Sequence, residues 1–513
     1  MSKKRENEEK IEFFFVLYVK LEQQNLKFHK MEGYMRRYDI WLNGDYAPHR
    51  GSLDKKPHQE EALRWLITRE ESANRGGILA DDMGLGKTYE LMGLMVAKPM
   101  ATTLIIVPPA LLEQWQNCLI KYVSGTRGLH VFHGRGAKAV PNVPYMLTTY
   151  MMVGKLVDKR DIEWGRIIFD EAHHLRNSNT RIYRDACRLR SPLKWGATGT
   201  PIQNRLHDLY SLCDILSVPC ARDLSQRTEF MLRRTKATVG LKLPAVELRD
   251  VIVPWKTEEE SEFAREIHEL APLVAPDGSN VDTIIRDLSG LNWNTLVTML
   301  RARQVCIDSQ MLSGVLEEHI DDIVIEQLSK SKIDAVVEQV SEKNGSNKLV
   351  FCHFRAEIDI LAERLRGNGL SVAVIDGRVA KGARKKILAA GDFLGAKLFD
   401  DIFAPHLNRT KSHRTDWLYD TVNEFLGATD VLIVQIQTAC EGLNLQQYQE
   451  VHFVSPHWNP AVEDQAIARC HRIGQTQPVR VFRYIMDTVS NQSFEQYCRS
   501  VQDVKREIMK LIE

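Results

Sequence analysis

The stretch Leu79-Ala-Asp-Asp-Met-Gly-Leu-Gly-Lys-Thr88 decides the fold predicted for this chain. It follows an apolar run that begins at Ile78, and a helical pattern through Leu91, Leu94 and Met95 comes after it. A strand, a glycine turn and then a helix is the arrangement that presents backbone N–H groups and a helix N-terminus to phosphate. The stretch therefore predicts an α/β fold with a phosphate-binding loop.

Two side chains of this loop carry specific expectations. Lys87 would reach the β- and γ-phosphates of a nucleotide, and the Thr88 hydroxyl would ligate Mg²⁺. Asp81 stands where the general phosphate-loop pattern has a glycine. A glycine-rich turn before a surface helix is the plainer alternative, but the Gly-Lys-Thr triplet favours the nucleotide. The nucleotide contacts expected in the loop are Asp82, Met83, Gly84, Leu85, Gly86, Lys87 and Thr88.

The composition is that of an ordinary globular protein. A length of 513 residues is enough for roughly two to four domains. Lys plus Arg is 68 and Asp plus Glu is 67, so nucleic-acid binding would have to come from local patches. The nine cysteines are scattered, without a Cys-x-x-Cys pair or zinc-type spacing, which indicates a reducing compartment and no structural zinc. The apolar run at 11–19 is too short to cross a bilayer, so an intracellular protein without a membrane segment is expected.

Short apolar runs alternate with amphipathic helical stretches from about residue 55, a pattern typical of an α/β parallel sheet. A second series of the same kind begins at residue 348, so the sequence predicts two nucleotide-fold lobes. From about 250 to 345 the strand pattern stops, and helical periodicity predicts a connection between the two sheets. The strands expected in the first lobe are 77–80, 103–107, 145–148, 166–169 and 194–197, and those in the second are 348–352, 371–375, 430–434, 450–454 and 479–484.

Polar groups follow the strand ends of the first lobe, where open α/β sheets bind ligands. Asp170 is placed to hold Mg²⁺ through water, and the adjacent Glu171 is placed to polarise an attacking water. Thr198 and Thr200 lie in a Gly-Thr-Pro turn that can form a hydrogen-bonding hinge between two ligand sites. Gln59, upstream of the first strand, has the acceptor and the donors that an adenine edge needs.

Together these motifs resemble those of superfamily two helicases and, more narrowly, of the SWI/SNF-like DNA translocase ATPases. The resemblance rests on Gln59, the loop 80–88, Asp170-Glu-Ala-His173 and Thr198-Gly-Thr-Pro-Ile-Gln-Asn204, and later motifs extend it over roughly residues 53–500. Asp81 is within the normal range of that family. The family implies an α/β fold of two RecA-like lobes with parallel sheets, joined by a helical connection, and it implies ATP and Mg²⁺ as cofactors.

The resemblance also implies contacts with double-stranded DNA. Segments 107–115 and 147–150 match stretches with which the family contacts the DNA backbone. Ala110 replaces a serine that is usual in the first of them. The contact residues implied by these segments are Pro108, Thr148 and Thr149.

Two motifs of the second lobe complete the resemblance. The stretch 435–445 is similar to the family's fifth motif and implies Gly442 at the nucleotide and Asn444 at the DNA, although Ala439 and Cys440 replace a usual pair of glycines.

The stretch Gln465-Ala-Ile-Ala-Arg-Cys-His-Arg-Ile-Gly-Gln475 resembles the family's last motif. It implies that Gln465 contacts the nucleotide and that Arg469 and Arg472 reach across the cleft to the γ-phosphate. Residues three apart share one face if the segment is helical. Because these arginines belong to the other lobe, hydrolysis would require the cleft to close.

The expected layout is an N-terminal segment at 1–47, a first helicase lobe at 48–250, a helical connection at 251–345, a second helicase lobe at 346–490 with a basic insertion at 379–413, and a brace helix at 491–513. The first helical protrusion of remodelling enzymes is largely missing, and no histone reader is visible. The insertion, or residues 1–47, is open to a protein partner. A solvated surface is the plainer reading of the insertion.

The expected function is that of a DNA-dependent ATPase that translocates on duplex DNA in transcription, repair or remodelling of DNA–protein complexes. A strand-separating DNA or RNA helicase has the same ATPase motifs, and a scaffold that binds ATP without turnover has the same fold, so both stay open as alternatives. The compact form is similar to ATPases of large DNA viruses or bacteria. The expected location is therefore the nucleus or cytoplasm, or a viral factory or virion for a viral protein.

Overall fold

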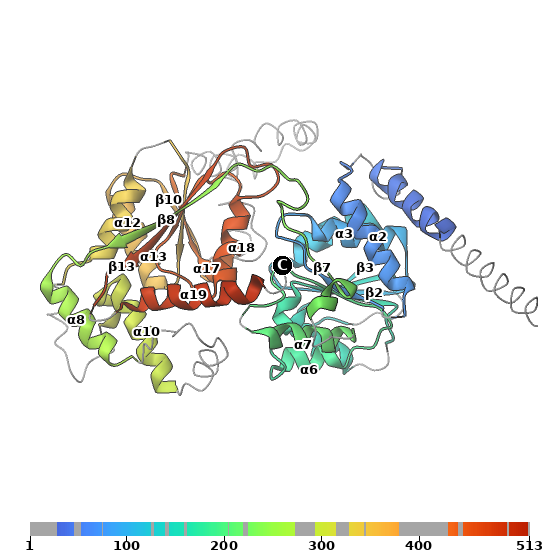
Figure 1. The fold of residues 1–513 in the computed structure, drawn as a ribbon, viewed down its shortest axis with the longest axis horizontal. Coiled ribbons are helices and arrows are strands. Elements are labelled where there is room, and N and C mark those ends of the chain that lie inside the picture. The colour runs from blue at the N-terminus through green and yellow to red at the C-terminus, as the bar shows by residue number, and fades with distance from the viewer. Residues whose placement is uncertain are drawn as a thin grey trace, which may run out of the picture. The chain divides into compact units, whose positions relative to one another are not determined.

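A computed structural model places most of the chain in two compact units, each built around one parallel sheet (Figure 1). The first unit comprises Met1–Pro201 and His207–Gly240, and the second comprises Ile202–Leu206 and Leu241–Glu513. The structure describes residues 28–45, 53–73, 75–124, 128–138, 143–158, 162–203, 205–218, 224–271, 293–313, 328–342, 345–378, 429–439, 445–489 and 492–510. The basic insertion expected at 379–413 lies outside these residues.

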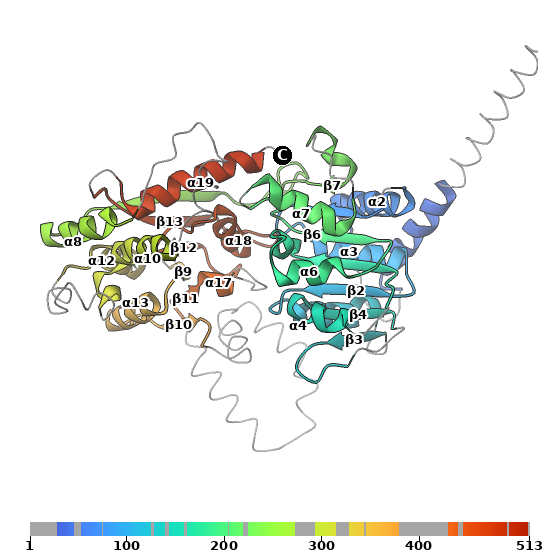
Figure 2. The same ribbon diagram turned by 90° about the horizontal axis from the view of Figure 1, so that it is seen from below.

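The first sheet has the strand order β3-β4-β2-β5-β6-β1-β7, and all its paired strands are parallel (Figure 2). Its strands are β1 (Gly77–Leu79), β2 (Thr103–Val107), β3 (Leu129–Phe132), β4 (Tyr145–Thr149), β5 (Arg166–Asp170), β6 (Lys194–Ala197) and β7 (Met231–Leu232). Its helices are α2 (Pro57–Glu71), α3 (Lys87–Ala97), α4 (Leu112–Leu119), α5 (Val153–Val157), α6 (Arg181–Cys187) and α7 (Leu206–Leu216).

Both faces of the first sheet are covered by helices. Leu79, Ile105 and Trp195 pack in one core with apolar residues of α2 and α3, while α6 and α7 lie on the other side of the sheet (Figure 1). Because both faces are buried, β2 reads as the unbroken apolar run that predicted it. The layering leaves the carboxyl ends of the strands, and the loops that follow them, available for ligands.

Residues 28–42 form a further helix that packs on the first unit. Its side chains Tyr38 and Trp41 are buried in the core shared with α2 and α3. The indole Nε1 of Trp41 donates a hydrogen bond of 2.7 Å to the main-chain oxygen of Tyr122. This part of the N-terminal segment is therefore a structural component of the first unit.

The second sheet has the strand order β10-β11-β9-β12-β13-β8, again with all paired strands parallel. Its strands are β8 (Val246–Val253), β9 (Lys348–Cys352), β10 (Val372–Ile375), β11 (Val431–Gln435), β12 (Glu450–Phe453) and β13 (Val479–Met486). Its helices are α8 (Glu258–Glu269), α10 (Trp293–Ile307), α12 (Ser331–Ser341), α13 (Arg355–Gly367), α17 (Ile436–Ala439), α18 (Pro460–Cys470) and α19 (Phe494–Lys510).

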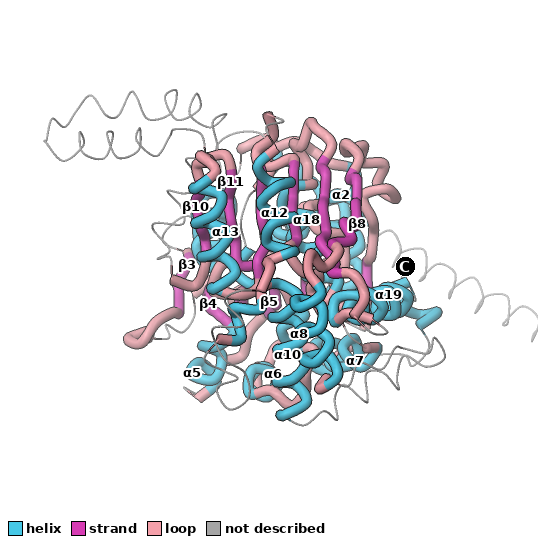
Figure 3. The backbone as a smooth tube through the Cα atoms, turned by 90° about the vertical axis from the view of Figure 1, so that its left-hand side faces the viewer, coloured by secondary structure: helices cyan, strands magenta, loops and turns pink. Residues whose placement is uncertain are grey.

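The helices of the second unit divide between two cores. Figure 3 shows α12 and α13 lying along one face of the sheet, and α8, α10 and α19 contribute to the same core, which includes Val350 and Tyr484. Leu349 and Phe351 face the other way and pack with residues of α18. The alternation of neighbouring strand residues between the two cores is the period of two expected of a covered sheet. The helices expected between 250 and 345 are thus packed on the second sheet.

Every strand predicted from the sequence is present, with ends that differ by one or two residues. The sequence pattern did not predict β3, β7 or β8. The expectation that the strand pattern stops near residue 250 is wrong for residues 250–253, because β8 pairs along its whole length with β13. β8 is an edge strand with a mostly exposed surface and charged residues such as Glu247 and Arg249, so it lacks an apolar run.

Candidate nucleotide-binding site

The predicted phosphate loop is a tight turn between β1 and α3. Gly84 and Gly86 adopt positive φ angles of 90° and 96°, a region that favours glycine. A Cβ atom at Gly86 would lie 2.3 Å from Nε2 of Gln59, so a side chain there would displace the Gln59 amide. Gly86 is the N-cap of α3, and no side chain caps the helix there. The loop therefore leaves a helix N-terminus of the kind that binds phosphate.

Lys87 is held by the loop itself. Its Nζ donates to the main-chain oxygens of Asp81 and Asp82, at 2.6 and 3.2 Å. Gly199 packs close by, since a Cβ atom there would lie 3.5 Å from this Nζ. The ammonium group is thus fixed beside the loop, next to the glycine that separates Thr198 from Thr200.

Asp81, the residue that departs from the general phosphate-loop pattern, is a buried anchor. The guanidinium of Arg234 bonds both of its carboxylate oxygens, and the Arg234 main-chain N–H donates to Oδ1 at 3.0 Å. Arg234 also contacts the carboxylate of Glu90 on α3, at 3.2 Å. Burial, followed by the charge of Asp81, raises the pKa of Glu90 well above its usual range. Arg234 is not among the residues predicted for the site.

Gln59 lies against the loop. Its Nε2 donates to the main-chain oxygen of Leu85 at 3.1 Å, and Nε2 of His58 lies 3.0 Å from the same oxygen. Both side chains are buried. The structure therefore brings Gln59 to the nucleotide loop, and its contact with adenine stays a prediction.

Asp170 is the last residue of β5, and Glu171 follows it. Trp115 donates from Nε1 to Oδ2 of Asp170 at 2.6 Å, and the Glu171 N–H donates to Oδ1 at 3.1 Å. Burial, followed by the charge of Glu171, raises the pKa of Asp170 to about 6. A nearby cation would favour the carboxylate form of Asp170, so its oxygens suit a divalent metal ion. Glu171 has a φ of 51°, an uncommon conformation for a residue with a side chain.

A line of polar contacts runs from Glu171 to the turn of Thr198 and Thr200. Nδ1 of His173 lies 3.3 Å from Oε2 of Glu171 and 3.2 Å from Oγ1 of Thr198. The Thr200 main-chain N–H donates to the same Oγ1 at 3.1 Å. Burial lowers the pKa of His173, which favours the neutral ring. The structure thus brings together the residues predicted for water activation and for the hinge.

The residues implied in DNA contact are at the ends of neighbouring strands, β2 and β4. Pro108 follows β2 directly and is buried, while the next residue, Pro109, is exposed. Thr148 and Thr149 are buried, and Oγ1 of Thr148 donates to the main-chain oxygen of Phe132 at 2.7 Å. Their contact with DNA stays a prediction, and the Thr148 hydroxyl would have to leave its present partner to make one.

The second unit carries the predicted arginines near the end of α18. Gln465 is buried on this helix, and Arg469 and Arg472 are half-buried. The two arginines were expected to share one face only if their segment is helical; α18 ends at Cys470 and Arg472 lies in the turn beyond it, so that condition is not met. The predicted residues Gly442 and Asn444 lie outside the described residues.

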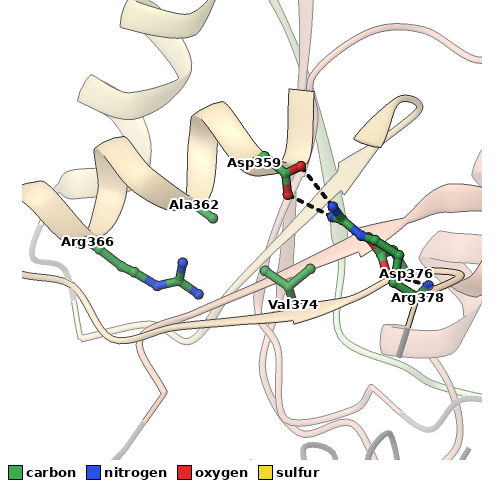
Figure 4. Close-up of a pocket in the computed structure, with 6 residues that line it drawn as sticks. All are labelled: Asp359, Ala362, Arg366, Val374, Asp376 and Arg378. Atoms are coloured by element: carbon green, nitrogen blue, oxygen red, sulfur yellow. Dashed lines mark hydrogen bonds and ion pairs between the residues drawn. The ribbon is translucent and has the colours of Figure 1, made fainter. Parts of the chain in front are cut away.

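A pocket of the second unit has none of the predicted site residues (Figure 4). It lies beside α13 and β10 and contains a guanidinium, that of Arg378, which forks onto Asp359 at 2.7 and 2.9 Å and also bonds Asp376. These carboxylates raise the pKa of Arg378. Arg366 also lines the pocket, so its two arginines and two aspartates leave the lining with no net charge to attract an anion such as phosphate.

Two family comparisons cover both parts of the chain. Residues 58–227 match the SNF2-related domain, and residues 401–474 match the helicase conserved C-terminal domain. The first match contains the loop, Asp170, Glu171 and the hinge turn, and the second contains Gln465, Arg469 and Arg472.

Curated relatives match over most of this chain. The "Probable global transactivator" of Orgyia pseudotsugata multicapsid polyhedrosis virus is 27% identical, over 90% of this chain and 92% of its own length. "Transcription termination factor 2" of Drosophila melanogaster is 25% identical over 88% of this chain, and "DNA excision repair protein ERCC-6-like" of Danio rerio is 24% identical over 86%. The chain spans 56% and 35% of the lengths of these last two relatives.

Among solved structures, the "Sulfolobus solfataricus SWI2/SNF2 ATPase core in complex with dsDNA" is 20% identical, with a TM-score of 0.38, over 91% of this chain and 99% of that one. At that TM-score the likeness supports no conclusion about this chain. Within the described residues, no helix has both the length and the apolar character needed to cross a membrane. The two domain matches, in the order in which the motifs predicted them, show that the chain carries an SNF2-related domain followed by a helicase conserved C-terminal domain.

Proposed function

We propose that this protein is an ATP-dependent translocase on duplex DNA, which couples hydrolysis to closure of its two lobes. The observation that carries the proposal is the path of contacts from Glu171 through His173 to Thr198 and Thr200. It ties the carboxylate that would orient the attacking water to the turn that would act as the hinge. A translocase needs such a tie, because hydrolysis must be converted into movement.

In the proposed site, the first lobe binds the nucleotide. The N-terminus of α3 and Lys87 bind the phosphates, Thr88 and Asp170 hold Mg²⁺, and Gln59 contacts the base. When bound, Mg²⁺ would supply positive charge that offsets the negative charge of the phosphates. Glu171 would orient the water. The backbone of Glu171 is in the left-handed region, which residues with a side chain rarely adopt. Such conformations are found most often at functional sites.

The second lobe would complete the reaction. We propose that Gln465 and Gly442 contact the nucleotide and that Arg469 and Arg472 approach the γ-phosphate when the lobes close. Arginine supplied in this way can raise the rate of phosphoryl transfer by ~10³–10⁵. The proposed lobes are 48–250 and 346–490.

Duplex DNA would bind at the strand ends of both lobes. Pro108, Thr148 and Thr149 would contact the backbone from the first lobe, and Asn444 from the second. The formal net charge of the chain is only +1, so the grip would come from local contacts rather than from a general attraction to phosphate.

The experiment that tests the proposal is ATP turnover measured side by side with duplex DNA, single-stranded DNA and RNA, with Glu171→Gln as the inactive control. Stimulation mainly by duplex DNA is expected, and stimulation by RNA alone would contradict the proposal. Displacement of a triplex-forming strand without unwinding of a forked duplex would then separate a translocase from a strand-separating helicase. A scaffold without turnover would show the same ATP turnover as its Glu171→Gln variant.

A further inference from the structure

Asp170 is held by two buried aromatic side chains, and each comes from a segment that we propose to contact DNA. The indole Nε1 of Trp115 donates to Oδ2 of Asp170 at 2.6 Å. The hydroxyl of Tyr150 donates to the main-chain oxygen of Asp170, also at 2.6 Å. Trp115 is 1% exposed and Tyr150 is 3% exposed, so neither bond is weakened by competing solvent.

Trp115 is connected rigidly to the loop after β2. The Leu111 main-chain N–H donates to the oxygen of Pro108 at 3.0 Å, and the Trp115 N–H donates to the oxygen of Leu111 at 2.9 Å. One helical turn of α4 therefore separates Trp115 from a loop whose residues Pro109 and Ala110 are exposed. A displacement of this loop by a bound backbone would be passed to the indole, because helical hydrogen bonds resist stretching.

Tyr150 is connected just as directly to the end of β4. It follows Thr149 without an intervening residue and begins a short 3-10 turn. The next residue, Met151, is 71% exposed, so the surface of the molecule lies one residue away from the buried hydroxyl. The ring of Tyr150 also packs against His174, with centroids 5.2 Å apart, which restricts its own movement.

The strand order explains why the side chains of Trp115 and Tyr150 both reach Asp170. β4, β2 and β5 are neighbours in the first sheet, and the ends of β2 and β4 are in register at Val107 and Thr149. β5 ends at Asp170 beside them. Trp115 bonds the carboxylate of Asp170 and Tyr150 bonds its main-chain oxygen. Together they fix both the position and the direction of the proposed metal ligand.

We propose that Trp115 and Tyr150 are positioning residues through which duplex DNA controls the metal-binding geometry of Asp170. This inference rests on the proposed function. DNA held at the ends of β2 and β4 would set the positions of the two donors, and Asp170 would follow because a hydrogen bond weakens steeply as its length and angle change. Outer partners of metal ligands commonly alter metal affinity 10- to 100-fold when they are removed.

The test uses the full chain with Trp115→Phe and Tyr150→Phe, each of which keeps the ring and removes the donor. Trp41→Phe is the matched control, because Trp41 is also 1% exposed and also donates a 2.7 Å indole bond, but to Tyr122. Tyr34→Phe is the second control, since its hydroxyl donates to Glu71 at 3.1 Å, away from Asp170.

Two quantities are measured. The first, without DNA or turnover, is the Mg²⁺ concentration that gives half-maximal binding of a fluorescent ADP. We expect Trp115→Phe to raise it roughly tenfold and both controls to leave it within about twofold. The second is the factor by which duplex DNA tightens Mg²⁺-dependent ADP binding, which we expect to fall towards one in Trp115→Phe and Tyr150→Phe and to be unchanged in the controls.

An equal rise in the Mg²⁺ requirement for Trp115→Phe and Trp41→Phe would overturn the inference, because the effect would then be a general loss of packing. The inference would also be overturned if duplex DNA tightened ADP binding as much in Trp115→Phe and Tyr150→Phe as in the unaltered chain. Failure of the proposed function looks different: duplex DNA would then fail to stimulate turnover of the unaltered chain. The DNA-free Mg²⁺ measurement would still decide whether Trp115 positions Asp170.

Discussion

Arg234 holds Asp81 in place beneath the phosphate loop, with the guanidinium on both carboxylate oxygens and the main-chain N–H at 3.0 Å from one of them. The same guanidinium reaches the main-chain oxygen of His58 at 2.5 Å and the carboxylate of Glu90. It therefore joins the loop, α3 and the helix of Gln59. An aspartate at this loop position is compatible with phosphate binding because its charge is neutralised by a buried arginine.

Removing this arginine is expected to destabilise the first unit. Arg234→Met would leave Asp81 buried without its partner, which should lower the free energy of unfolding by roughly 3 kcal/mol. Glu90→Gln should cost less, because the raised pKa of Glu90 already favours its neutral form. Urea unfolding followed by tryptophan fluorescence measures both.

Arg188→Met is the control for the loss of an arginine. Its partner is Asp158, at 2.7 Å, but the two side chains are 51% and 61% exposed. Exposed pairs contribute about 0–1 kcal/mol. An equal loss of stability in Arg188→Met and Arg234→Met would show that the buried pair of Arg234 and Asp81 contributes no more than an exposed pair.

Thr198→Val should uncouple hydrolysis from DNA. The substitution removes the oxygen that meets both His173 and the Thr200 N–H, at nearly constant volume. We expect the stimulation of ATP turnover by duplex DNA to fall roughly tenfold, the effect of losing a hydrogen bond of about 1–2 kcal/mol. Thr198→Ser, which keeps the oxygen, should retain most of the stimulation.

Thr103→Val is the matched control for that measurement. Thr103 is buried in β2 of the same unit, and its hydroxyl has no hydrogen-bond partner among the described residues. A valine there removes a hydroxyl without breaking a bond. Similar stimulation in Thr198→Val and Thr103→Val would refute the proposed coupling path.

The strands were predictable where burial made them uniform. β2 and β5 are buried along their whole lengths, so each contains an apolar run, 104–107 in β2 and 167–169 in β5. β8 escaped prediction because it lies at an edge, where exposed Glu247 and Arg249 interrupt the pattern. An apolar run in the sequence indicates a buried strand, and an edge strand such as β8 is largely exposed, so it has no such run.

The residues of the site also fall into two groups, those that lie in short sequence motifs and those whose partners are far away in the sequence. Lys87, Thr88 and Glu171 were predictable because each belongs to a short motif whose chemistry is contained within a few residues. The partners of Asp81 and Asp170 were not, because Arg234 is 153 residues from the first and Trp115 is 55 residues from the second. A buried arginine and a buried indole both need a hydrogen-bond acceptor, but the sequence does not say which one. Only the sheet topology brings them together.

The two arginines of the second unit should affect catalysis rather than binding. Arg469→Ala and Arg472→Ala are each expected to lower single-turnover ATP hydrolysis by ~10³ or more, with fluorescent ADP binding changed by only a few-fold, since the γ-phosphate is their proposed target. Arg506→Ala, on α19 of the same unit, is the control and should leave both quantities unchanged. Equal losses of binding and of hydrolysis would contradict the assignment, because they would indicate uniform binding rather than stabilisation of the transition state.

Acid should destabilise the second unit through His457. Burial, followed by the charge of Arg303, lowers the pKa of His457 to about 4. Its Nδ1 lies 2.9 Å from the main-chain nitrogen and 3.0 Å from the main-chain oxygen of Asn459. Its ring stacks on His353, whose pKa is lowered well below the usual range chiefly by burial.

The sign follows from the depressed pKa. The stability that neutral His457 contributes is complete above pH 6.5, the ordinary pKa of histidine, and is lost as the pH falls towards about 4. Between pH 7 and pH 5 the expected loss is roughly 2 kcal/mol. Unfolding by urea at several pH values measures it. His457→Gln should flatten the pH dependence by that amount, whereas His29→Gln, at a side chain 75% exposed, should leave it unchanged. If both variants keep the slope of the unaltered chain, His457 is not the group that makes the second unit sensitive to acid.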